Sequence, residues 1–177
     1  MIKKIIILIG FIGIGLISAN KFMAKTEIKV GDKLPAFTLK DQHGKDFTAT
    51  DYIGKKALVI YFYPKDDTPG CTKEACAFRD EFEVFTDLNA LVIGISSDDV
   101  ASHKKFAEKY KLPFTLLADT KKEVRKLFGV PKFMGTIAGR VTYIFNKKGE
   151  VIYIFNSMRK AVKHIEEAKK ILESQKE

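Results

Sequence analysis

The feature that most constrains the fold of this chain is an uninterrupted apolar run, residues 57–63 (ALVIYFY), followed directly by a loop and a cysteine. Such a run is typical of a strand buried on both faces of a sheet. The loop at 64–71 contains proline and glycine, and apolar residues at helical spacing follow it from Thr72. Cys71 therefore lies at the carboxyl end of a buried strand and at the start of a helix, where a thiol is placed to react.

The rest of the chain alternates between strand-like and helix-like segments. We expect an opening loop and first strand at 30–39, a turn at 41–44 into a strand at 46–48, further strands at 91–95 and 114–117, and a hairpin of 141–146 with 151–155. Helices are predicted at 72–88, from about 98 to 110, at 121–128 and at 159–173. Residues 96–98 offer the N-cap of the second helix. Asp119 is the expected cap of the third helix, and Gly129 ends it. This order predicts an α/β fold, a mixed central sheet flanked by helices.

The length of 177 residues indicates one folded domain, preceded by a distinctive N-terminus. Lys3 and Lys4 precede an uncharged apolar run at 5–19, which is the pattern of a secretory signal. A membrane span needs about 20 residues, so this run is short for one. We therefore predict a signal peptide or membrane anchor at 1–24 and a domain at 25–177. We expect the domain to be exported by a bacterium to the periplasm or cell exterior. If the N-terminus is an anchor, residues 5–19 tether the domain to the membrane.

The formal net charge of +9 does not indicate a nucleic-acid partner. The lysines are spread along surface-like helical stretches such as 104–105 and 121–122, and no basic block is interleaved with aromatic residues. A solvated basic surface is the favoured interpretation, and weak attraction to an anionic membrane or cell wall is the alternative.

The chain contains two cysteines, Cys71 and Cys76. In an exported protein the plain interpretation is a structural disulfide. On one helix, however, five residues correspond to about 140° of rotation and a Cα separation of roughly 8.6 Å. A disulfide tolerates up to ~7 Å, so the bond requires local unwinding of the helix. A disulfide that requires the native helix to unwind is poorly suited to stabilise the fold, but it can serve as a redox switch.

Cys71 is the favoured nucleophile of the pair. Free backbone N–H groups and the positive end of the helix dipole stabilise a thiolate at a helix start. Cys76 lies more than a turn further on, where we expect it to be half-buried, and a small core residue is its alternative role. A structural metal is disfavoured, because the cysteine spacing is not C-x-x-C and the histidines are scattered.

The residues before Cys71 are ordinary turn formers when taken one at a time. Pro64 ends the strand and stiffens the loop, and Pro69 and Gly70 shape the turn into the helix. Thr68 lies three residues before Cys71, so in a tight loop its hydroxyl reaches the thiolate or an incoming substrate oxygen. Together these residues suggest a cradle for a nucleophile.

The spacing P-x-x-x-T-x-x-C from Pro64 to Cys71 matches the active-site signature of peroxiredoxins. The segment DTPGCTKEAC at 67–76 closely resembles the bacterioferritin comigratory protein, or Q-type, subfamily of the AhpC/TSA family, whose members carry a second cysteine five residues on. The resemblance extends from about residue 30 to about residue 167. It includes GDKLPAF at 31–37, HKKFAEKY at 103–110 and GRVTYIF at 139–145.

This resemblance implies a thioredoxin-like fold and a thiol-dependent peroxidase that reduces hydrogen peroxide and organic hydroperoxides without metal, haem or flavin. It implies that Cys71 is the peroxidatic cysteine and Cys76 the resolving one. Thr68 would hydrogen-bond the peroxide, Arg140 would pair with the thiolate, and Pro64 would complete the site. A thioredoxin-like dithiol protein would reduce the intramolecular disulfide. We expect a monomer, because such a disulfide needs no second chain.

Two other functions remain open at this point. A thioredoxin-like thiol–disulfide oxidoreductase suits an exported setting, although such proteins usually carry C-x-x-C. An exported binding domain with an inert bridge is the non-enzymatic alternative. Insulin reduction without peroxide turnover favours the first of these, and a disulfide that resists mild reductant favours the second.

Overall fold

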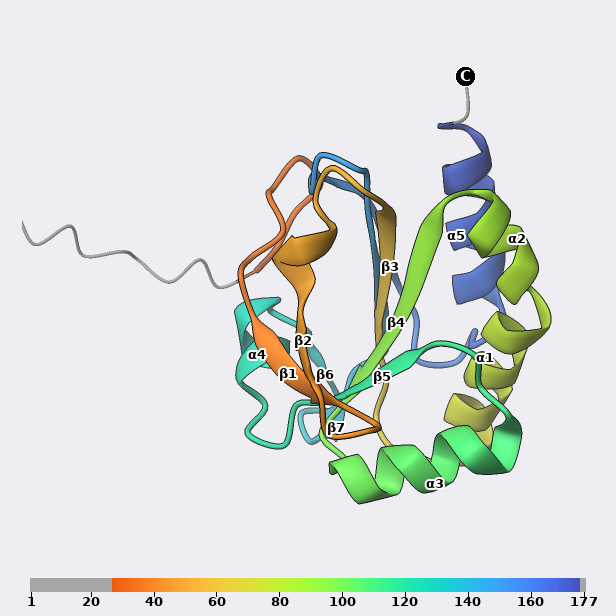
Figure 1. Cartoon of the computed structure of the whole chain (residues 1–177). Coiled ribbons are helices and arrows are strands. Elements are labelled where there is room, and N and C mark those ends of the chain that lie inside the picture. Colours follow the sequence, from red (N-terminus) through yellow and green to blue (C-terminus); the bar gives the residue numbers. More distant parts are fainter. Residues whose placement is uncertain (1–26, 176–177) are drawn as a thin grey trace, which may run out of the picture.

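The computed structural model describes residues 27–175. In this part of the chain, a seven-stranded sheet runs in the order β2-β1-β5-β4-β3-β8-β9, and β6 and β7 form a separate hairpin (Figure 1). The pairings β3–β4 and β4–β5 are parallel and the others are antiparallel. The predicted mixed sheet is therefore confirmed. The strands are β1 (Thr38–Asp41), β2 (Asp46–Thr48), β3 (Ala57–Phe62), β4 (Ala90–Ser96), β5 (Thr115–Ala118), β6 (Lys132–Phe133), β7 (Ile137–Ala138), β8 (Val141–Phe145) and β9 (Val151–Asn156).

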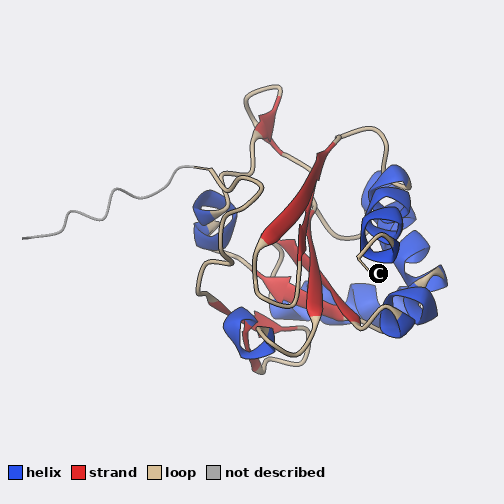
Figure 2. Ribbon diagram, turned by 90° about the horizontal axis from the view of Figure 1, so that it is seen from above, coloured by secondary structure: helices blue, strands red, loops and turns tan. Residues whose placement is uncertain are grey.

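Helices cover both faces of the sheet. The 3₁₀ turn η1 and the short helix α4 lie on one face, and the other four helices lie on the opposite face (Figures 1 and 2). The helical segments are η1 (Ala49–Tyr52), α1 (Pro69–Asp80), α2 (Phe82–Asp87), α3 (Val100–Tyr110), α4 (Glu123–Leu127) and α5 (Lys163–Glu173). This layering confirms the prediction of a central sheet flanked by helices.

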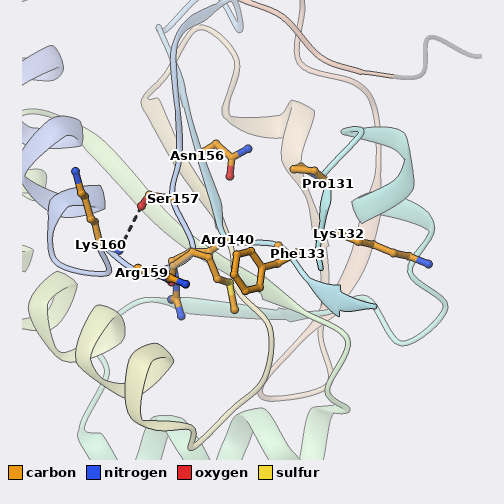
Figure 3. Close-up of a pocket in the computed structure, with 10 residues that line it drawn as sticks. Pro131, Lys132, Phe133, Arg140, Asn156, Ser157, Arg159 and Lys160 are labelled. Atoms are coloured by element: carbon orange, nitrogen blue, oxygen red, sulfur yellow. Dashed lines mark hydrogen bonds between the residues drawn. The ribbon is translucent and has the colours of Figure 1, made fainter. Parts of the chain in front are cut away.

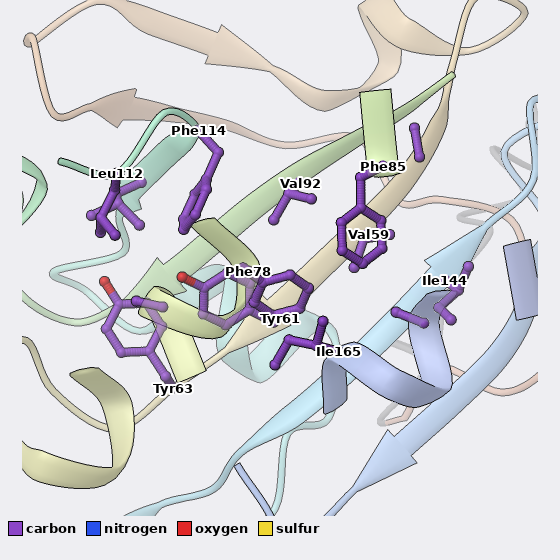
Figure 4. Close-up of a cluster of buried hydrophobic side chains, with 14 of the residues drawn as sticks. Val59, Tyr61, Tyr63, Phe78, Phe85, Val92, Leu112, Phe114, Ile144 and Ile165 are labelled. Carbon is purple, nitrogen blue, oxygen red and sulfur yellow. The ribbon is translucent and has the colours of Figure 1, made fainter. Parts of the chain in front are cut away.

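Strand β3 lies inside the sheet and is buried along its whole length, as its apolar run predicts. Its side chains alternate between two cores. Val59 and Tyr61 face the core beneath α1, α2, α3 and α5, where the rings of Tyr61 and Phe78 stack at 4.7 Å between centroids (Figure 4). Ile60 and Phe62 face the core beneath η1 and α4. The strand is thereby held on both sides, and the loop that leaves its carboxyl end starts from a rigid base.

The helix predicted at 72–88 is two helices in the structure. Helix α1 begins earlier, at Pro69, whose missing N–H costs nothing in the first turn of a helix. Glu81 has φ −101° and ψ 11°, which is not helical, and it separates α1 from α2. Cys71 is consequently the third residue of α1, and Cys76 lies in the same helix.

Other boundaries differ from the prediction for identifiable reasons. The N-cap of α3 is Asp99 rather than a residue of 96–98, and its carboxylate accepts the Ser102 N–H at 2.8 Å. Helix α5 starts at Lys163, later than predicted. The hairpin β6–β7 was not predicted. Helix α4 spans only Glu123–Leu127, and its N-cap is Lys122 rather than the predicted Asp119. The Asp119 carboxylate still accepts hydrogen bonds from the N–H groups of Val124 and Arg125 in the first turn.

The apolar run at 5–19 lies outside the described residues, as does the proposed boundary between residues 24 and 25. Within residues 27–175, no helix has the length and apolar character that crossing a membrane requires.

Candidate active site

The thiol of Cys71 is buried at the start of α1, with 2% of the residue exposed. The loop from Tyr63 brings the chain to Thr68, whose extended backbone ends in a carbonyl that accepts the Thr72 N–H at 2.8 Å. Cys76 is half-buried further along the same helix, and both cysteines are free thiols. The thiol therefore lies in the first turn of α1, where a thiolate is favoured by the helix dipole.

Arg140, the residue directly before β8, contacts this thiol. Its Nη2 donates to the Sγ of Cys71 at 3.4 Å, and only 2% of the residue is exposed. Gly70 allows the approach, because a Cβ at that position would lie 3.2 Å from the same Nη2. A buried guanidinium against a thiol stabilises the thiolate form. The structure thus brings together two of the residues that the sequence indicated.

Glu74 is a third member of the site that sequence reasoning missed. It is fully buried and forms an ion pair with Nη1 of Arg140. Burial raises the pKa of Glu74 to about 8, against the opposing effect of Arg140. Burial also acts to lower the pKa of Arg140, but Glu74 and Cys71 raise it overall, so the guanidinium stays charged. The i, i+3 spacing from Cys71 was the available signal, because it puts both side chains on one helix face.

Behind Glu74 lies a fully buried histidine from α5. The Nε2 of His164 is 2.9 Å from the Ser157 carbonyl oxygen, and its Nδ1 is 2.8 Å from the Thr142 hydroxyl. The carbonyl can only accept, so Nε2 carries the proton and Nδ1 accepts from the threonine. Burial lowers the pKa of His164 to about 4. The imidazole is therefore neutral at pH 7, and it lies 3.7 Å from the Glu74 Oε1.

Arg125 of α4 ties together the two chain segments that carry the site. Its Nη2 donates to the Tyr63 carbonyl at 2.7 Å, at the end of β3. Its Nη1 donates to the Gly139 carbonyl at 3.0 Å, next to Arg140. Gly139 must be a glycine here, because a Cβ would lie 2.2 Å from the Pro131 carbonyl oxygen. The two hydrogen bonds from Arg125 therefore fix the loop of Cys71 relative to the backbone next to Arg140.

A buried polar cluster supports the loop from below. The Asp66 carboxylate accepts hydrogen bonds from the Tyr63 hydroxyl at 2.7 Å and the Ser102 hydroxyl at 2.7 Å, and it lies 2.9 Å from Nδ1 of His103. Burial acts to raise the pKa of Asp66, but His103 and the two hydroxyls hold it below its usual range. The ring of His103 also contacts the Leu117 carbonyl at 3.0 Å through Nε2. The charged carboxylate thus fixes the loop to α3.

Thr68 and Pro64 lie in the loop between β3 and Cys71. The Thr68 hydroxyl donates to the Lys65 carbonyl at 3.0 Å, so its own lone pairs remain available as acceptors. Pro64 follows β3 directly and, with Ser97 and Arg125, lines a cavity on the far side of the loop. Both residues are close in the chain to Cys71. Their contact with a substrate stays a prediction.

A cavity of about 440 Å³ opens beside Arg140. Its walls combine apolar side chains, Phe133 and Met158, with the cationic ones of Arg159 and Lys160. In Figure 3, Arg140 and Phe133 lie side by side at its centre, while Lys132 extends away from them. The guanidinium that touches the thiol is therefore also part of a cavity wall.

Across 27–175, no three His, Cys, Asp or Glu side chains are grouped so that they could hold a metal ion. The site brings together a buried thiol, a charged guanidinium and the carboxyl group of Glu74 in one cluster.

Comparisons with known proteins agree with this geometry. Residues 30–154 match the model of the AhpC/TSA family. A chloroplastic peroxiredoxin Q of Populus jackii is 51% identical over 156 residues, covering 88% of this chain and 72% of that protein. The crystal structure of peroxidoxin BcpB from Mycobacterium tuberculosis superposes with a TM-score of 0.79 at 32% identity, covering 85% of this chain and all of that one. The bacterioferritin comigratory protein of Xanthomonas campestris, studied for its alkyl peroxide reduction, superposes with a TM-score of 0.72 at 28% sequence identity. The match covers 81% of this chain and 99% of that one.

These comparisons confirm the thioredoxin-like peroxiredoxin fold and correct the predicted location. The apolar N-terminal run led to the prediction of a bacterial protein exported to the periplasm or cell exterior. That prediction is contradicted by the curated relatives, which are chloroplastic peroxiredoxins Q.

Proposed function

Because the chain belongs to the AhpC/TSA family and is a thioredoxin-dependent peroxiredoxin of the Q type, we propose that Cys71 carries out its reduction of peroxides. The observation that supports this assignment best is the 3.4 Å contact between the Arg140 guanidinium and the buried Cys71 Sγ. A cysteine thiolate held by a cation at a helix start is an activated nucleophile. Hydrogen peroxide and organic hydroperoxides are the proposed substrates.

In the first step, the Cys71 thiolate attacks the distal oxygen of the hydroperoxide. An S–O bond forms as the O–O bond breaks, and its electron pair leaves with the proximal oxygen. That oxygen takes up a proton and departs as water or an alcohol, while Cys71 becomes a sulfenic acid. Sulfur is oxidised by two electrons and the peroxide is reduced by two.

Three groups are placed to assist this transfer. Arg140 compensates the negative charge that moves from sulfur to the leaving oxygen, and a fixed cation in a dry site needs no reorganisation. The backbone N–H of Cys71, in the first turn of α1, is a further donor. The Thr68 hydroxyl already donates to the Lys65 carbonyl, so we assign it the role of accepting the O–H of the bound peroxide. Pro64, directly after β3, stiffens the loop that carries Cys71.

Cys76 is the proposed resolving cysteine. Five residues apart on α1, the two Cα atoms lie roughly 8.6 Å from each other in regular helical geometry, beyond the ~7 Å reach of a disulfide. The first turns of α1 must therefore unwind before the Cys76 thiol can attack the sulfenic acid. The new S–S bond forms with release of water. A thioredoxin-type dithiol then reduces the disulfide by exchange and is itself oxidised.

The cavity beside Arg140 supports organic hydroperoxides as substrates. Phe133 and Met158 offer apolar contacts to a hydrocarbon tail next to the guanidinium that faces the thiol. We further propose that residues 25–177 form the catalytic unit and that it acts as a monomer, since both cysteines belong to one helix.

Hydrogen peroxide consumption coupled to thioredoxin, thioredoxin reductase and NADPH tests this function. The wild-type protein is expected to turn over continuously, and Cys71→Ser is expected to show no turnover. Cys76→Ser is the matched control, because it retains the nucleophile and is expected to consume one equivalent before it stalls. Failure of wild-type Cys71 to become oxidised, combined with reduction of insulin, would instead identify a disulfide oxidoreductase.

A further inference from the structure

A second cavity, of about 450 Å³, lies between α4, the β6–β7 hairpin and the loop after β3. Its lining is strongly cationic. The side chains that line it include five cations and no carboxylate, and the cations are Lys121, Lys122, Arg125, Lys126 and Lys132. Lys132 lines both this cavity and the one beside Arg140, and in Figure 3 its side chain extends away from Arg140.

The four lysines are not balanced by acidic partners within the described residues. None of them takes part in an ion pair between residues 27 and 175, and all four are exposed at the rim. The buried carboxylate of Asp119 accepts hydrogen bonds from the backbone N–H groups of Val124 and Arg125. Like charges gathered without counter-ions repel one another, so the arrangement lowers its energy when an anion binds.

Two residues that line the cavity each carry a buried donor without a partner among the described residues. Arg125 is 7% exposed, and its two terminal nitrogens donate to backbone carbonyls, but its Nε is buried with no hydrogen bond. The Ser97 hydroxyl is likewise buried without a partner among the described residues. Leaving buried polar groups unpaired is costly, which indicates that a ligand completes their hydrogen bonding.

We propose that this cavity binds a compact polyanion, a small molecule with several phosphate or carboxylate groups. Its volume falls within the roughly 300–1,000 Å³ of ordinary ligand sites. The lysines supply charge at the rim, and the two unpaired donors belong to Arg125 and Ser97, which also line the cavity.

Arg125 connects this cavity to the active site. It holds the Tyr63 carbonyl and the Gly139 carbonyl, which belong to the segments that carry Cys71 and Arg140. A bound anion therefore stabilises the folded arrangement of both segments. Binding itself needs no cysteine, so the proposal is separate from the peroxidase assignment and can be measured on Cys71→Ser protein.

Isothermal titration calorimetry with inorganic tripolyphosphate tests the site. We expect the wild-type protein to bind one equivalent, and the pair Lys122→Gln with Lys126→Gln to bind about tenfold more weakly. The pair Lys104→Gln with Lys105→Gln removes the same charge from exposed positions on α3 and is expected to bind within about twofold of wild type. If both double variants bind tripolyphosphate equally more weakly than wild type, the effect comes from the net charge of the protein and the proposal is wrong.

Two further measurements sharpen the result. Ser97→Ala is expected to weaken tripolyphosphate binding several-fold without lowering the melting temperature, since it removes a hydroxyl that has no partner in the free protein. Citrate in place of tripolyphosphate distinguishes a carboxylate ligand from a phosphate ligand. If neither anion binds the wild type, while the Lys122 and Lys126 variants raise the KM for thioredoxin, the surface docks a protein and the small-ligand proposal is wrong.

Discussion

Arg140 and Cys71 are 69 positions apart in the chain, yet the guanidinium Nη2 lies 3.4 Å from the thiol Sγ. The contact depends on two further arrangements. Glu74 pairs with the other terminal nitrogen and so orients the guanidinium. Arg125 fixes the backbone on both sides by binding the carbonyls of Tyr63 and Gly139. The proposed chemistry of the site rests on this geometry.

Replacement of Arg140 by lysine is expected to lower kcat/KM for hydrogen peroxide about 100-fold. An ammonium keeps the charge but cannot serve Glu74 and Cys71 at once, whereas the guanidinium fork does. Stopped-flow oxidation of the thiol measures the effect. Arg79→Lys is the matched control, because Arg79 pairs with Asp80 at the surface. A rate for Arg140→Lys within about twofold of wild type would refute the assigned role.

The cavity beside Arg140 predicts that a change in its lining affects the KM for large and small hydroperoxides differently. Phe133→Ser is expected to raise the KM for cumene hydroperoxide about tenfold and to leave hydrogen peroxide unaffected, because only the larger substrate reaches the lost apolar surface. Met134→Ser provides the control, since Met134 is the next residue but is 79% exposed and does not line the cavity. Parallel changes for both substrates would argue against a binding role for Phe133.

His164 predicts a pH dependence of stability. Its folded pKa of about 4 lies below the usual 6.5, so between these values the unfolded chain binds more protons than the folded one. The free energy of unfolding therefore falls as the pH drops from about 6.5 towards 4, by about 2 kcal/mol for this residue at pH 4.5. Urea unfolding at pH 7.0 and pH 4.5 is expected to show a smaller loss in His164→Gln. All other groups titrate in both proteins, so an identical loss would exclude His164 as the cause.

Gly94 and Tyr61 predict a pair of opposite stability effects. A Cβ at position 94 would lie 2.7 Å from the Tyr61 hydroxyl oxygen and 2.8 Å from Leu116 Cδ2, so Gly94→Ala is expected to cost about 1–3 kcal/mol. The Tyr61 hydroxyl is buried without a partner, so Tyr61→Phe is expected to retain or increase stability. Denaturant unfolding tests both. A destabilised Tyr61→Phe protein would show that the hydroxyl makes a contact that the structure lacks.

Local sequence patterns were sufficient for the scaffold. The apolar run at 57–63 predicted β3, and the turn at 147–150 predicted the pairing of β8 with β9, because each signal lies within a few adjacent residues. The break at Glu81 escaped prediction, since the apolar spacing continues across it. The N-terminal apolar run predicted export, and the chloroplastic relatives contradict that location.

The site was only partly predictable for a different reason. The placement of Cys71 follows from a strand, a loop and a helix in sequence. Arg140 was indicated by resemblance alone, because nothing local distinguishes it from an exposed arginine. Arg125 and His164 reach the site through contacts between elements far apart in the chain, and no sequence spacing encodes such contacts.

Intact-mass analysis after one equivalent of hydrogen peroxide tests the central claim most directly. The account predicts that the wild-type protein loses two hydrogens, through a disulfide between Cys71 and Cys76 within one chain. Cys76→Ser is predicted to gain one oxygen at Cys71, and Cys71→Ser to keep its mass. A wild-type protein that keeps two free thiols, or that forms its disulfide between two chains, would contradict the account.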